Sequence, residues 1–288
     1  MTAPLADNVR WSVPSHEKYL STADGQSIYA SARGTGRIAV VVVHGFTGGH
    51  RHGSFSRLLG WFEQHFLVIA VDQRGHGKSS GSCTLSHFEV FDVDAAVEWA
   101  RELGASKVIT VGFSMGASSV IRHAALSRTD ERSLYDEGIV LRHAPDAMVS
   151  IGGVSRWWFR GTTMMKILHL SVNTALGRAY LKYRQGVTIN DDTWPDENHP
   201  SRLEIQPWDP QQCAARLGSL PVLFIQGELD KYFPPEHGKT LAEIATSAPE
   251  HSTTFWFEHG MGHAEAATTQ KLVNRIGEWI HSAVGAQS

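Results

Sequence analysis

The chain has 288 residues, of which 26 are lysine or arginine and 29 are aspartate or glutamate, so its formal net charge is −3. This near balance argues against a nucleic-acid-binding protein, which needs a clustered surplus of basic side chains. With 42% apolar residues and no low-complexity tract, the chain is expected to fold around a large core, as one domain with an insertion.

Two features predict a location in the cytoplasm. The two cysteines, Cys83 and Cys213, are too few and too far apart in sequence to form a disulfide framework. The first residues lack the basic and apolar regions of a secretory signal peptide, and the longest purely apolar run, 38–43, is too short to span a bilayer. We therefore expect no integral membrane segment, and the sequence leaves the oligomeric state open.

The predicted elements begin with an antiparallel hairpin, in which residues 18–20 and 28–30 flank a polar turn. Six short apolar runs follow and are predicted to be strands buried on both faces: 38–43, 66–71, 108–113, 147–151, 221–226 and 253–257. Apolar residues spaced by three or four predict amphipathic helices over 90–100 and 272–283. This alternation predicts an α/β fold with a mostly parallel central sheet and helices on both faces.

One long segment, 156–218, interrupts the alternation because it contains no convincing buried strand. Its first part is crowded with large apolar side chains, including Trp157, Trp158, Phe159 and Met164. Such an insertion predicts a small helical excursion that covers one edge of the sheet and lines a substrate pocket. An extra pair of packing helices with no functional role is the alternative.

The strongest local signal is the pentapeptide Gly-Phe-Ser-Met-Gly at 112–116, which lies between a predicted strand and a predicted helix. A sharp turn at this junction strains the backbone at Ser114 and projects its hydroxyl above the sheet, with glycines two residues away on either side to leave room. Ser114 is therefore the predicted nucleophile.

A serine nucleophile needs a base, and the base needs a carboxylate to orient it. Asp230 and His263 each follow a predicted strand, at the sheet edge where parallel sheets place their sites. They are the predicted acid and base. Glu228 is the competing acid and His259 the competing base.

Two backbone N–H groups are predicted to bind the oxyanion. The sequence His-Gly-Phe-Thr-Gly-Gly at 44–49 follows the first long buried strand, and its glycines let backbone N–H groups approach a ligand closely. The N–H groups of Phe46 and Met115 are the candidates.

The order of these motifs resembles the α/β-hydrolase superfamily. The resemblance rests on His44 and Gly45, on the stretch Asp-Gln-Arg-Gly-His-Gly-Lys-Ser at 72–79, and on the elbow, acid and histidine loops. The 72–79 stretch is most like the branch of lysophospholipases, monoacylglycerol lipases and carboxylesterases. The resemblance implies a core over 1–155 and 219–288, and a helical cap over 156–218, inserted after the sixth strand. We interpret Asp72, Arg74 and His76 as structural residues that pin a turn near the site, rather than as participants in the chemistry.

These features together predict a serine hydrolase that cleaves a carboxylic ester with an apolar acyl or aryl group through an acyl-enzyme intermediate. A thioesterase would use the same machinery, and a C–C bond hydrolase of a ring-cleavage product would use the same triad. A non-catalytic ligand-binding protein with this fold is the third alternative.

The sixteen histidines invite a metal-site hypothesis. The closest pair, His50 and His52, has no Cys, Asp or Glu nearby in sequence to complete a set of ligands, so a solvated loop is favoured. We therefore expect a small-molecule ester as the substrate and no metal or other cofactor.

Overall fold

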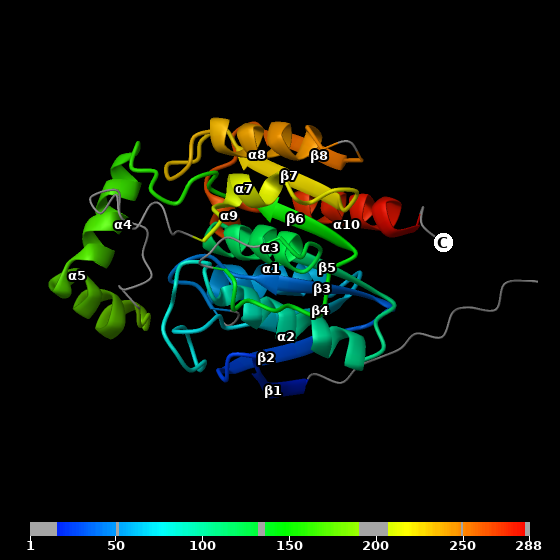
Figure 1. The fold of residues 1–288 in the computed structure, drawn as a ribbon, viewed down its shortest axis with the longest axis horizontal. Helices are drawn as coiled ribbons and strands as arrows, with labels where there is room; N and C mark the ends of the chain where they lie inside the picture. The colour runs from blue at the N-terminus through cyan, green and yellow to red at the C-terminus, as the bar shows by residue number, and fades with distance from the viewer. Residues whose placement is uncertain (1–15, 50–51, 132–135, 190–206, 249, 286–288) are drawn as a thin grey trace, which may run out of the picture.

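The structure, a computed structural model, describes residues 16–49, 52–131, 136–189, 207–248 and 250–285. Its centre is an eight-stranded sheet of order β1-β2-β4-β3-β5-β6-β7-β8, in which β2 is antiparallel to both of its neighbours and all later pairs are parallel (Figure 1). The strands are β1 (His16–Ser21), β2 (Ser27–Gly34), β3 (Ile38–Val43), β4 (Leu67–Val71), β5 (Lys107–Phe113), β6 (Ala147–Ile151), β7 (Pro221–Gly227) and β8 (Ser252–Glu258). The α/β-hydrolase fold is confirmed, and the hairpin at the sheet edge is β1 and β2.

Helices cover both faces of the sheet. One face packs on α1 (Gly53–Phe62) and α10 (Gln270–Gly285), and the other on α2 (Glu89–Glu102), α3 (Met115–Leu126) and α8 (Glu236–Thr246). Alternate residues of β3 belong to the two hydrophobic clusters, as the strand period of two requires: Val40 and Val42 face α1 and α10, while Val41 and Val43 face α2 and α3. Both predicted amphipathic helices are present, as α2 and α10.

The prediction that every run is buried on both faces is wrong for β8. Its two ends and Phe257 are partly or fully exposed, and no residue of the strand is fully buried. The cause is its position, since β8 is the last strand of the sheet and pairs only with β7. Its apolar and aromatic composition alone does not distinguish an edge strand from a central one.

The helices after β6 stand apart from the sheet. We call α4 (Thr163–Asn173), α5 (Ala175–Tyr180) and the π-helical turn η1 (Leu181–Gln185) the cap helices. They lie beyond one end of the sheet, at the left of Figure 1. The short helix α7 (Pro210–Ala214) returns to the core, where Cys213 and Ala214 join the cluster that contains α3. Residues 190–206 of the predicted insertion lie outside the described residues.

No helix in the described ranges is long and apolar enough to cross a membrane.

Candidate active site

Ser114 occupies a tight turn between β5 and α3. Its backbone has φ of 52° and ψ of −114°, a strained conformation for a residue with a side chain. A Cβ on Gly112 would lie 2.2 Å from the Gly116 carbonyl oxygen, and a Cβ on Gly116 would lie 2.3 Å from the Val43 carbonyl oxygen. Only glycine fits at these two positions, so the pentapeptide spacing has a direct steric cause.

His263 links Ser114 to Asp230. Its Nε2 lies 2.8 Å from Ser114 Oγ, and its Nδ1 lies 2.7 Å from Asp230 Oδ2. His263 directly precedes the short helix α9 (Ala264–Ala267), and the rings of Tyr232 and Phe233 pack against the imidazole at centroid distances of 4.4 and 5.5 Å. The three predicted side chains come from loops far apart in sequence and form one hydrogen-bonded chain.

Asp230 is held by several donors besides His263. Its Oδ1 accepts the backbone N–H groups of Tyr232 and Phe233 at 2.8 and 3.0 Å, and its Oδ2 accepts Gln226 Nε2 at 3.1 Å. The side chain is fully buried. These bonds fix the carboxylate and satisfy its charge away from water, so it presents one oxygen to the histidine.

Glu228 and His259, the alternatives to Asp230 and His263 as acid and base, lie next to each other on the surface. Glu228 and His259 are exposed, and Glu228 Oε2 lies 3.5 Å from His259 Nδ1. The same carboxylate oxygen accepts the Gly260 N–H at 2.9 Å, and this hydrogen bond lowers the pKa of Glu228. The structure therefore brings Asp230 to His263 and pairs Glu228 with His259 outside the site.

The loop after β3 is pinned by a buried hydrogen-bond network. His44 Nε2 accepts the Gln73 N–H at 3.0 Å, which leaves His44 Nδ1 to donate to the Gly45 carbonyl oxygen at 2.7 Å. The Gln73 side chain donates to the His44 carbonyl oxygen at 2.7 Å and accepts from Ser119 Oγ at 3.0 Å. This network fixes the loop that carries Phe46 against the start of α3.

The N–H groups of Phe46 and Met115 lie on this loop and on the first residue of α3. None of the hydrogen bonds formed among the described residues uses either N–H group. Met115 is anchored through its carbonyl oxygen, which accepts Ser86 Oγ at 2.9 Å. Both groups are therefore free to donate to a ligand.

The stretch 72–79 forms a rigid turn beside this loop. Arg74 forms ion pairs with Asp92 and Asp24, and its N–H donates to Asp92 at 2.7 Å. Burial, with a smaller contribution from His44, lowers the pKa of His76 to about 4. These contacts agree with the interpretation of Arg74 and His76 as structural residues.

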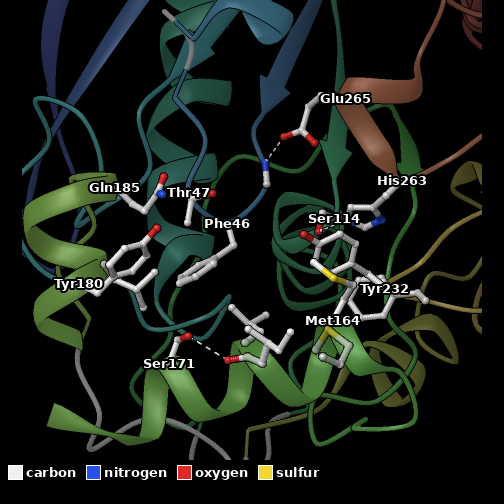
Figure 2. Close-up of a pocket in the computed structure, with 16 residues that line it drawn as sticks. Phe46, Thr47, Ser114, Met164, Ser171, Tyr180, Gln185, Tyr232, His263 and Glu265 are labelled. Carbon is white, nitrogen blue, oxygen red and sulfur yellow. Dashed lines mark hydrogen bonds between the residues drawn. The ribbon is translucent and has the colours of Figure 1, made fainter. Parts of the chain in front are cut away.

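A cavity of about 250 Å³ opens between the pair Ser114 and His263 and the cap helices (Figure 2). It is lined by Ser114 and His263 on one side and by α4 on the other, including Met164, Met165 and Leu168. A smaller cavity of about 50 Å³ is lined by Trp157 and Met115 and shares Ser114 with the larger one. Ser114 therefore lines both of these cavities.

The predicted pocket residues divide into two pairs. Met164 lines the larger cavity and Trp157 the smaller one. Trp158 and Phe159 line neither, because Trp158 faces the Arg156 guanidinium and Phe159 packs against Phe233 and His237. An apolar run in sequence does not reveal which of its neighbouring side chains turns inward.

Several residues at the site have no counterpart in the sequence prediction: Thr47, Tyr180, Gln185, Gln226, Tyr232, Phe233 and Glu265. Gln226 could have been predicted to lie at the site, because it is a polar residue at the end of an otherwise apolar predicted strand. The others reach the site through tertiary packing that no local pattern records.

In the described part of the chain, no three His, Cys, Asp or Glu side chains gather as metal ligands. His50, from the histidine pair considered as a metal site, lies outside the described residues.

Comparisons with known proteins agree with this architecture. A family model described as the alpha/beta hydrolase fold matches residues 38–132. A proline iminopeptidase of Neisseria gonorrhoeae is 30% identical over 148 residues, covering 50% of this chain and 47% of that protein. The chain thus matches about half the length of this relative.

A second relative is the (E)-2-((N-methylformamido)methylene)succinate hydrolase of Acinetobacter baylyi, which is 24% identical over 219 residues, 68% of this chain and 82% of that protein. Among solved structures, an esterase of Pyrococcus furiosus superposes with a TM-score of 0.66 at 16% identity, covering 93% of this chain and 91% of that one. The sheet order, the elbow at Ser114 and these similarities lead to one conclusion: the chain has the α/β-hydrolase fold.

Proposed function

We propose that this chain is a serine hydrolase that cleaves a carboxylic ester with an apolar acyl or aryl group. The observation that carries the proposal is the unbroken chain of hydrogen bonds from Ser114 Oγ through His263 to Asp230, at 2.8 and 2.7 Å. With Nδ1–H donating to Asp230, the imidazole Nε2 is the acceptor for the serine proton.

The reaction has two halves. Ser114 Oγ attacks the ester carbonyl carbon while its proton passes to His263 Nε2, and the oxyanion accepts the N–H groups of Phe46 and Met115. His263 then protonates the leaving alcohol, which departs as the acyl-enzyme forms. In the second half, water attacks the acyl carbon and gives a proton to His263. The imidazolium then returns this proton to Ser114 Oγ as the bond between Oγ and the acyl carbon breaks, which releases the acid and regenerates Ser114 and neutral His263. Asp230 stays ionised throughout and stabilises the imidazolium.

The two cavities support the choice of substrate. Their lining is rich in aromatic and methionine side chains, which bury large apolar area and adapt in shape. Of the predicted insertion 156–218, we assign the cap helices α4, α5 and η1 as the cap over the site, with α4 facing Ser114 across the larger cavity. Because of the sequence motif at 72–79, we place the chain nearest the branch of lysophospholipases, monoacylglycerol lipases and carboxylesterases. The two buried, unpaired cysteines, Cys83 and Cys213, support a cytoplasmic location.

A panel of p-nitrophenyl esters of increasing acyl chain length tests the proposal. Wild type is expected to hydrolyse at least part of the panel, and Ser114→Ala to lose roughly 10⁵–10⁶-fold in kcat. Equal, slow rates for wild type and Ser114→Ala on every ester would sink it. Matched thioesters in the same assay separate an esterase from a thioesterase.

A further inference from the structure

Glu265 places a carboxylate in the wall of the larger cavity. It lies on α9, two residues after His263, and its Oε1 accepts the Gly45 N–H at 2.6 Å (Figure 2). The carboxylate thus joins the histidine loop to the loop that carries Phe46. It has no part in the hydrogen-bonded chain from Ser114 to Asp230.

The carboxylate is close to the nucleophile. A Cβ atom on Gly45 would lie 2.9 Å from Glu265 Oε1 and 3.0 Å from Ser114 Cβ, so these two atoms are at most 5.9 Å apart. The carbonyl carbon of an acyl group on Ser114 Oγ would therefore lie near the Glu265 carboxylate.

In the part of the chain that the structure describes, no lysine or arginine balances the negative charge of Glu265. Among the described residues, no lysine or arginine lines the cavity, and Glu265 has no ion pair. Aromatic rings line the same space, namely Phe46, Tyr180, Tyr232 and Phe233. A carboxylate together with aromatic faces is the chemistry that binds an ammonium group.

The reaction itself makes this arrangement selective. Negative charge develops on the carbonyl oxygen in the transition state, and a nearby carboxylate opposes it. A cationic group on the acyl chain would reverse that effect, because it attracts both the carboxylate and the oxyanion. A neutral acyl group gains nothing from Glu265, and an anionic one is repelled.

We propose that Glu265 is a specificity-determining residue that favours acyl groups carrying an ammonium close to the scissile carbonyl. The inference rests on the hydrolase function proposed above, and it narrows the substrate to cationic acyl esters.

Three p-nitrophenyl esters of similar size test it. The first carries γ-trimethylammonio-butyrate, the second its carbon isostere with tert-butyl in place of trimethylammonium, and the third is the half-ester of glutarate. The readout is the ratio of kcat/KM between esters, which cancels differences in enzyme concentration. For wild type we expect the cationic ester to exceed its isostere by roughly tenfold, and the anionic ester to be the poorest.

Glu265→Gln removes the charge and keeps an oxygen that accepts the Gly45 N–H. We expect it to lower the cation-to-isostere ratio by about tenfold, through slower turnover of the cationic ester and faster turnover of the neutral one. Glu265→Asp keeps the charge and is expected to retain a preference for the cation. Glu228→Gln is the matched control, since Glu228 also accepts one glycine N–H but lies outside the cavity.

The outcomes separate this inference from the proposed function. Ester hydrolysis that depends on Ser114 but shows no cation preference, or a ratio unchanged by Glu265→Gln, overturns the role of Glu265 alone. An equal loss on all three esters in Glu265→Gln would mean that the side chain only positions the Gly45 loop, and it also overturns the inference. Failure of wild type on all esters would overturn both proposals.

Discussion

At the scale of single residues, the turn at Ser114 depends on the absence of two side chains. The carbonyl oxygens of Gly116 and Val43 occupy the places where Cβ atoms of Gly112 and Gly116 would lie. The spacing of the glycines could be read from the sequence, because a strained serine between a strand and a helix needs them. The sequence does not reveal which atoms exclude a Cβ at these positions, because Val43 lies more than sixty residues away in the chain.

Gly116→Ala is expected to destabilise the fold by more than about 2 kcal/mol, because the blocking atoms are backbone and cannot move aside cheaply. Gly60→Ala is the matched control. Gly60 lies inside α1, and no atom comes within 4 Å of the place that a Cβ would take, so alanine should be neutral or stabilise by up to about 1 kcal/mol. Urea unfolding of both variants measures the difference. Equal stability of the two would contradict the steric account of the elbow.

At the scale of elements, α4 presents one side to the cavity and another to solvent. Leu168 lines both cavities, whereas Leu170, two residues on, is 65% exposed. The crowd of apolar residues after β6 could be predicted to form a helical excursion. Which side of α4 faces the cavity could not be predicted, because both sides carry large apolar groups and the hydrophobic pattern does not distinguish them.

Leu168→Ala is expected to enlarge the space beside Ser114 and to shift the best acyl chain to a longer one, with a higher KM for short chains. Leu170→Ala removes the same atoms from the outer side of the same helix and should leave the chain-length profile as in wild type. The p-nitrophenyl ester panel measures both profiles. A shift of equal size in Leu170→Ala would contradict the assignment of the inner face.

At the scale of the whole molecule, sequence order predicted the sheet well and the site only in part. Each predicted strand exists, and the order of motifs brings Ser114, Asp230 and His263 to one edge because parallel strands end there. The sequence did not predict that β8 lies at the edge of the sheet, or that the side chain of Glu265 faces the cavity. Both depend on which neighbours a residue meets in the folded chain.

Two buried histidines make the whole fold sensitive to acid. Burial lowers the pKa of His76 and of His237 from 6.5 to about 4. As pH falls from about 6.5 to 4, the unfolded chain takes up protons at these positions and the folded chain does not. The contribution of these two neutral rings to the free energy of unfolding is therefore fully present above pH 6.5. It decreases as the pH falls toward 4, by up to about 3 kcal/mol for each ring.

His237→Asn tests this at one ring. The asparagine oxygen can replace Nδ1 as the acceptor of the Ser155 N–H, which lies 3.1 Å from it, but it takes up no proton. Between pH 7 and pH 4.5, the free energy of unfolding should fall by about 2–3 kcal/mol less in the variant than in wild type. Urea unfolding at a series of pH values measures both slopes. Parallel curves would show that His237 does not contribute to acid sensitivity.

In the proposed mechanism, Ser114 is the nucleophile of a serine hydrolase, activated by His263 and Asp230. The most direct measurement is the intact mass of the protein after treatment with a fluorophosphonate, with peptide mapping of the modified residue and parallel assay of ester hydrolysis. We expect one adduct, on Ser114, formed in step with the loss of activity and absent in Ser114→Ala. Ester hydrolysis that persists without an adduct, or an adduct on another residue that accounts for the loss of activity, would contradict it.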